Sequence, residues 1–148
     1  MTATIREQVL QAFHDKLSAI EIAGLRVDRN RDIPVEDYPS IVMVDGGQVA
    51  DAENPGVKDI EMRVDVECFV RANTPGELAP AFDEIYGKTV QAVLADRTLG
   101  ALAVDIDEDE LDDPIIAREE GVGPTLAASL SFTVRYWVDP DDPYTLAS

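Results

Sequence analysis

The segment 125–138, near the end of the chain, alternates between apolar and polar side chains, and this pattern constrains the fold more than any other feature. Because successive side chains of a strand point to opposite sides of a sheet, it predicts a long β-strand with one buried face. Typical strands have about five to six residues, so this one can cross a whole sheet and project beyond it. It carries no catalytic motif, which points towards a structural role. Its predicted buried face consists of Leu126, Ala128, Leu130, Phe132, Val134, Tyr136 and Val138.

Two segments have the three- and four-residue apolar spacing of amphipathic helices. The first begins where Thr4 and Glu7 form the pattern of a capping box, and we expect it to end at Gly24. The second begins with the same pattern at Thr74 and Glu77 and is expected to end near residue 95. The predicted apolar stripes are Ile5, Val9, Phe13, Leu17 and Ile20 in the first helix, and Leu78, Phe82, Ile85, Thr89, Ala92 and Val93 in the second.

Further strands are predicted at residues 25–29, 41–44, 60–70, 102–106 and 115–116. The run 41–44 is continuously apolar, which is typical of an inner strand with both faces covered. Strands that follow one another along the chain favour antiparallel pairing, so we predict an α+β fold with a mostly antiparallel sheet of about five to six strands and two amphipathic helices packed on one face. Residues 1–138 are expected to form this single domain, followed by an acidic, Pro-containing tail at 139–148.

The chain is strongly acidic, with 12 Lys and Arg against 30 Asp and Glu in 148 residues, a formal net charge of −18. A surface this negative repels nucleic-acid backbones and anionic membranes, and no apolar run approaches the length of a bilayer span. We therefore expect neither specific DNA binding nor membrane association. Composition alone does not separate a role in solubility from a role in which an anionic partner passes close by without binding.

The densest acids lie in the run 105–113. Aspartates at alternate positions resemble the opening of a calcium-binding loop, but Glu110 stands where that loop requires glycine and Ile116 where it requires a bidentate glutamate. We therefore predict a solvated acidic loop rather than a metal site. Its aspartates are Asp105, Asp107, Asp109, Asp112 and Asp113.

No complete catalytic or cofactor-binding motif occurs in the sequence. One cysteine and one histidine cannot form a zinc site of the usual composition. Cys68 falls on the predicted buried face of the strand 60–70 and is interpreted as a core residue, whereas His14 lies off the apolar stripe and is interpreted as solvated. We predict no cofactor, no metal and no enzymatic activity. An enzyme would have to rely on carboxylates.

Several features, taken in order, resemble the tail terminator proteins of long-tailed phages, which are also called minor tail or tail completion proteins. An N-terminal amphipathic helix is followed by a Val-x-Arg strand, and an acidic-aromatic-proline sequence leads into an apolar strand. A second helix and a final apolar strand follow, so the resemblance spans nearly the whole chain. The matching segments are Val27-Asp28-Arg29, Asp37-Tyr38-Pro39-Ser40-Ile41-Val42-Met43-Val44, Phe82-Asp83-Glu84-Ile85-Tyr86, Leu94-Ala95-Asp96-Arg97-Thr98-Leu99-Gly100 and Tyr136-Trp137-Val138.

The resemblance implies a homo-oligomeric ring, expected to be a hexamer, that caps the tail tube, ends its growth and forms the head–tail joining surface. Its partners would be other copies of itself, the tail tube protein and a head–tail connector or neck protein, in the virion tail and in the host cytoplasm during assembly. The aspartates of the run 105–113 would line a negative lumen through which DNA passes without specific binding. Candidate interface residues are Trp137 and Tyr136 and, in a polar, mobile loop expected at 45–59, Gly46, Gly47, Asn54 and Pro55.

Other functions remain open. The same features are compatible with another phage neck or head-completion protein. A monomeric, non-viral cytosolic adaptor domain would show no concentration-dependent assembly, and a carboxylate-based enzyme would hold acids with raised pKa values in a concave pocket. Trp137 could also cover a helix of its own subunit instead of anchoring an interface.

Overall fold

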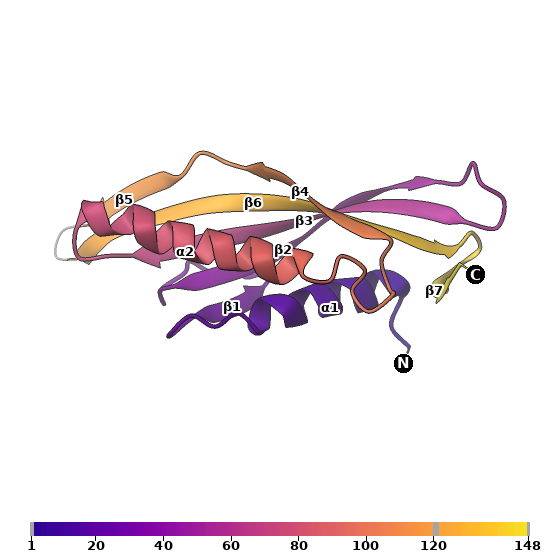
Figure 1. The fold of residues 1–148 in the computed structure, drawn as a ribbon, viewed down its shortest axis with the longest axis horizontal. Helices are drawn as coiled ribbons and strands as arrows, with labels where there is room; N and C mark the ends of the chain where they lie inside the picture. Colours follow the sequence, from indigo (N-terminus) through magenta and orange to yellow (C-terminus); the bar gives the residue numbers. More distant parts are fainter. Residues whose placement is uncertain (1, 120–121, 148) are drawn as a thin grey trace.

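The computed structural model describes residues 2–119 and 122–147, which form an elongated molecule (Figure 1). A seven-stranded sheet carries two helices on one face, which confirms the predicted α+β class. The helices are α1 (Ile5–Ser18) and α2 (Pro75–Leu94). The strands are β1 (Arg26–Arg29), β2 (Ser40–Asp51), β3 (Lys58–Arg71), β4 (Asp105–Leu111), β5 (Ile115–Glu119), β6 (Val122–Asp139) and β7 (Asp142–Leu146).

The sheet is built around β6, the long strand that the alternating pattern predicts. The strand order is β1-β2-β3-β6-β4, and β5 and β7 also pair with β6. One edge of β6 is covered by β3, while β5, β4 and β7 follow one another along its other edge. Only the pair β1–β2 is parallel among the described strands, so the sheet is mixed but mostly antiparallel.

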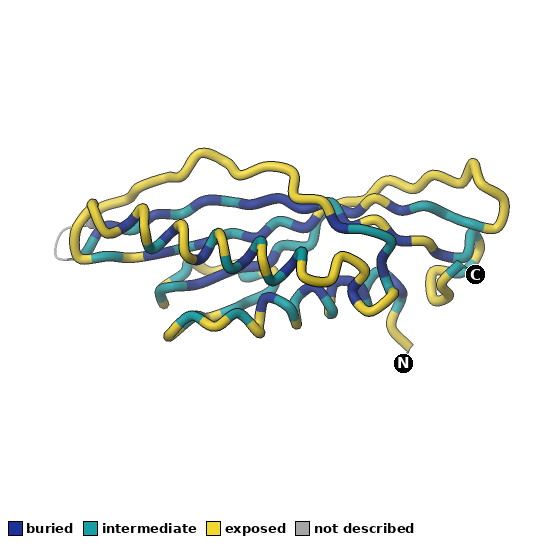
Figure 2. Tube along the Cα trace, viewed as in Figure 1, coloured by how far each residue is buried: buried dark blue, intermediate teal, exposed yellow. Residues whose placement is uncertain are grey.

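The core lies between the helices and the face of the sheet that they cover. Alternate residues of β3 and β6 are buried, as the period of two predicts (Figure 2). Phe13 of α1 meets Phe132 of β6 edge to face, with ring centroids 5.6 Å apart. The buried core residues include Val9, Leu10, Leu17, Ile41, Met43, Met62, Val64, Val66, Cys68, Leu78, Ile85, Leu130 and Val134.

The first predicted capping box forms only in part, and the second does not form. The Thr4 hydroxyl accepts a hydrogen bond from the Glu7 amide at 3.1 Å, but the Glu7 carboxylate binds Arg29 instead of returning to the cap. In α2, Thr74 makes no side-chain cap. The prediction that the first helix reaches Gly24 is also wrong, because α1 ends at Ser18, where the Ala19 amide already closes the last turn.

The segment 45–59, predicted to be a mobile loop, is mostly strand. After a bulge between Asp45 and Gln48, β2 continues to Asp51 in register with β3, and the two strands form a hairpin that projects at one end of the molecule (Figure 1). We call residues 47–61 the hairpin arm. Its polar composition suggested a loop, but pairing with β3, itself paired to β6, holds it extended.

Two more acidic segments are strands. Residues 105–111 of the run predicted to be a solvated loop form β4, which starts at Asp105 rather than at Leu102, where the predicted strand 102–106 begins. Hydrogen bonds to β6 satisfy backbone N–H and C=O groups of β4, while its carboxylates remain exposed to solvent. Within the predicted tail 139–148, residues Asp142–Leu146 form β7, which folds back on the end of β6.

Candidate assembly surfaces

The face of the sheet opposite the helices is polar and strongly negative. We call it the open acidic face. The register aligns its residues across β3, β6 and β4, for example Asp59 beside Trp137 and Arg135 beside Asp105. Only the β4 acids of this face were predicted from the sequence, although the polar positions of β3 alternate with its apolar ones. The open acidic face comprises Asp59, Glu61, Arg63, Asp65 and Glu67 from β3, Ser129, Ser131, Thr133 and Arg135 from β6, and Asp105, Asp107, Asp109 and Glu110 from β4.

The structure brings the five predicted aspartates together along one edge of this face. Asp105 and Asp107 pair in register with β6, and Asp109, in the β4 bulge, accepts a hydrogen bond from the Thr133 hydroxyl. Asp112 and Asp113 lie in the connection to β5, where they line a groove of about 180 Å³. No group of acids, His and Cys among the described residues has the arrangement of a metal site.

The arginines of the open acidic face are engaged by carboxylates. Arg135 binds Asp59, with a shortest N–O distance of 2.5 Å, and Arg63 binds Asp65 at 2.8 Å. Arg97, at the β4 edge, lies 3.7 Å from Asp105. Since carboxylates outnumber guanidinium groups here and hold them, the face presents mainly negative charge to solvent.

Glu67 differs from the other acids of this face because its environment is partly apolar. It lies beside Phe69 and Val42 in a groove of about 380 Å³ that is bounded on its other side by the 31–38 segment. Burial raises the pKa of Glu67, and the negative charge of Asp65 raises it further. The groove therefore holds one acid whose charged form is disfavoured.

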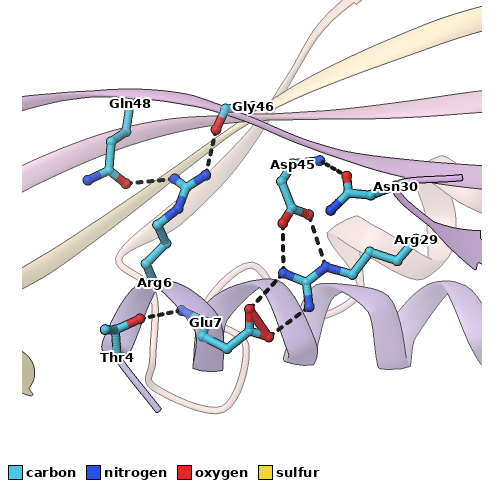
Figure 3. A network of polar contacts seen from close by, with 8 residues as sticks. All are labelled: Thr4, Arg6, Glu7, Arg29, Asn30, Asp45, Gly46 and Gln48. Atoms are coloured by element: carbon cyan, nitrogen blue, oxygen red, sulfur yellow. Dashed lines mark hydrogen bonds and ion pairs between the residues drawn. The ribbon is translucent and has the colours of Figure 1, made fainter. Parts of the chain in front are cut away.

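The base of the hairpin arm is fixed by polar contacts to α1 and β6. Arg6 donates to the Gly46 carbonyl at 2.6 Å and to Gln48 Oε1 at 2.8 Å (Figure 3). Tyr136 Oη donates to the same Gln48 oxygen at 2.9 Å. These contacts fix the orientation of the arm relative to the rest of the molecule.

Arg29 joins three elements at the same place. Its guanidinium donates two hydrogen bonds to Glu7 of α1 and two to Asp45 of β2 (Figure 3). The hydrogen bonds from Arg29 lower the pKa of Glu7. Burial alone would raise the pKa of Asp45, but hydrogen bonds from Arg29 and Asn30 lower it. Arg29, part of the Val-x-Arg segment, therefore has an architectural role that sequence reasoning did not assign.

The predicted interface residues lie in different environments. Trp137 is 42% exposed on the open acidic face, so it does not cover a helix of its own subunit. Tyr136 points the other way and is only 2% exposed, so it is not available to a partner. Gly47 is exposed beside the bulge, whereas Gly46 is partly buried. Asn54 and Pro55 are exposed at the tip of the arm.

Several of the exposed apolar side chains lie at the two ends of the long axis. Ile115 and Ile116 of β5 are 71% and 56% exposed at one end. Val49 of the arm is 72% exposed at the other, near Trp137. Cys68 is buried, which confirms its interpretation as a core residue, and desolvation raises its pKa to about 12. None of the described helices has the length and apolar character needed to cross a membrane.

Comparison with models of protein families finds no match to this chain, and no curated protein matches its sequence.

Proposed function

We propose that this protein is a structural subunit of a phage tail that acts as a tail terminator. Copies of it form a ring, which we expect to be a hexamer, that caps the tail tube, ends tube growth and provides the surface on which the head joins. The observation that carries this proposal is the open acidic face, a broad sheet surface without a covering helix. Because this face is polar and is not covered by a helix, it is suitable for the wall of a water-filled channel.

The charge of this face matches the passage of DNA. A channel wall that presents carboxylates repels phosphates, so the genome slides through without being held. Guanidinium groups that could bind phosphate, such as those of Arg63 and Arg135, are already paired with Asp65 and Asp59. DNA is thus a passing molecule in this proposal, not a ligand.

Packing subunits of net charge −18 against one another costs electrostatic free energy. Salt screens exposed charges over about 8 Å at physiological ionic strength, and apolar contacts must offset the remainder. The exposed apolar residues at the two ends of the molecule, Val49 and Ile115 among them, are suitable for such contacts.

A carboxylate-based enzyme is the second candidate, and Glu67 is the observation that favours it. Its raised pKa and its position in a groove meet two requirements of a general acid. A phage neck or head-completion protein would share the surfaces of a terminator, whereas an adaptor domain would act as a monomer.

The deciding experiment adds the purified protein to tail tubes and images them by negative-stain electron microscopy. We expect rings at tube ends and, in light scattering, a mass that rises with protein concentration. Rings that attach to heads or connectors but not to tube ends would favour a neck or head-completion protein. A protein that stays strictly monomeric and does not bind tail tubes would contradict the proposal and favour an adaptor domain.

A further inference from the structure

The hairpin arm has an unprotected strand edge. β1 covers the outer edge of β2 only from Ser40 to Met43, and from Gly47 to Asp51 no described strand pairs with it. The five residues Gly47 to Asp51 are all exposed and carry a single charge, that of Asp51. An exposed edge with few charges is a template for pairing with another chain.

The strand β5 has a second unprotected edge. One side of β5 pairs with β6, and among the described strands none pairs with the other side. It begins with Ile115, Ile116 and Ala117, all exposed and uncharged (Figure 2). Like the arm edge, this edge is five residues long.

The neighbouring strand β4 has an edge with features that disfavour pairing with another strand. Its outer edge has a bulge between Glu108 and Glu110 and a nearly continuous row of carboxylates. Bulges and charges are the usual means of preventing edge-to-edge association. By contrast, the first three residues of β5 are uncharged and precede its register shift, which lies between Ala117 and Glu119 beside the charged Arg118. The arm edge lies beyond the bulge at its base and carries one charge, that of Asp51.

We propose that the arm edge of one copy, residues 47–51, pairs with β5 of the next copy. The strands β2 and β6 run in the same direction, because each is antiparallel to β3. β5 is antiparallel to β6 and hence to β2. If neighbouring copies face the same way, the new pair is therefore antiparallel, and the open acidic faces of successive copies form one surface. This inference rests on the proposed ring and names the contact that builds it.

Each edge pairs with a second copy of the chain, because the two free edges of one copy lie too far apart to pair with each other. In register, the arm residue Ala50 aligns through Ile60 with Tyr136 of β6, whereas Ile116 of β5 aligns with Leu126. These β6 positions are 136 − 126 = 10 residues apart, about 33 Å at 3.3 Å per residue. Two different patches that complete each other make a head-to-tail contact, which closes into a ring when the rotation between copies allows it.

The test uses two edge variants of the full chain, followed by light scattering and sedimentation over a range of concentrations. One variant combines Val49→Glu with Ala50→Glu in the arm, and the other combines Ile115→Glu with Ile116→Glu in β5. Leu111→Glu, on the protected strand β4, and Tyr144→Glu, on β7, are matched controls, since both residues are exposed and apolar. Circular dichroism verifies that every variant is folded.

We expect the wild type and both controls to assemble. Each edge variant should stay monomeric, with self-association weakened at least about tenfold because central apolar contacts dominate interface energies. Mixed in equal amounts, the two edge variants should form a heterodimer and nothing larger, because each supplies the edge that the other lacks.

Three results would overturn this contact: assembly of both edge variants like the wild type, dimerisation of one edge variant by itself, or a wild type that stays monomeric. Edge variants that assemble and still cap tubes would refute the contact while leaving the terminator proposal intact. If the edge variants form a heterodimer but the wild type never caps tubes, the contact would be supported and the terminator proposal would be refuted.

Discussion

Gly46 lies so close to Arg63 that a Cβ atom at residue 46 would be 2.2 Å from the Arg63 carbonyl oxygen. The two residues face each other across the bulge at the base of the hairpin arm. At the adjacent Gly47, a Cβ would meet nothing within 4 Å. One glycine of the pair is therefore required by packing and the other is not.

We predict that Gly46→Ala destabilises the protein by about 1 to 3 kcal/mol, the usual cost of forcing extra atoms into a packed site. Gly47→Ala is the matched control and should change the free energy of unfolding by less than about 0.5 kcal/mol. Urea denaturation measures both. Equal effects of the two substitutions would contradict the assigned role of the bulge.

We predict that Arg29→Ala lowers the free energy of unfolding at pH 7 by about 1 to 2 kcal/mol. Hydrogen bonds to charged groups contribute about 1.5 to 3 kcal/mol, and partial exposure of Glu7 reduces that value. Arg26→Ala, which removes exposed ion pairs with Asp37 and Asp28, is the control and should lower the free energy of unfolding clearly less than Arg29→Ala does.

The same site predicts a dependence on pH. The pKa values of Glu7 and Asp45 are lower in the folded chain than in the unfolded one, so the unfolded chain binds more protons at acidic pH. The stability that they contribute is present above the unfolded values, about 4, and is lost as the pH falls further. Denaturation between pH 6 and pH 3 should therefore be less pH-dependent in Arg29→Ala than in the wild type. Parallel curves would refute this.

For Glu67, the sign of the pH effect is reversed. Its pKa is raised in the folded chain, so its favourable contribution is present below the unfolded pKa and is lost as the pH rises. We predict that Glu67→Gln raises the melting temperature at pH 7 and that this gain disappears near pH 4. Glu61→Gln, at an exposed position of the same strand, controls for the loss of a surface charge. A destabilising effect of Glu67→Gln at pH 7 would contradict the prediction.

We predict no measurable binding of duplex DNA at physiological salt, that is, weaker than the roughly 10⁻⁴ to 10⁻⁶ M of non-specific binders. Asp107→Lys with Glu110→Lys should create salt-sensitive binding because both positions lie on the open acidic face. Asp15→Lys with Asp83→Lys changes the net charge equally on exposed helix positions and should not. Fluorescence polarisation measures all three proteins, and equal binding by both variants would show that position on the molecule is irrelevant.

The strands β3 and β6 could be predicted from the sequence because each has a clear alternation of apolar and polar residues. Alternation places Met62 and Cys68 on one face and Glu61 and Glu67 on the other, and only an extended chain with one buried face satisfies this pattern. The helices could be predicted for the same reason, from a different period. The C-terminal end of α1 could not be predicted from Gly24, because the helix stops at Ser18, where the Ala19 amide donates to the Asp15 and Lys16 carbonyls.

The hairpin arm and β4 required the tertiary structure. Gly46, Gly47 and the aspartates after Asp105 have low intrinsic preference for strands, and the local sequence therefore indicated loops. Their backbones are extended because β3 and β6 offer hydrogen-bonding edges, which lie far away along the chain. The same holds for the contact of Arg29 with Asp45 and for the free edges of the arm and β5. Local periodicity decides which face of a segment is buried, whereas the partners of that segment depend on distant residues that only folding brings together.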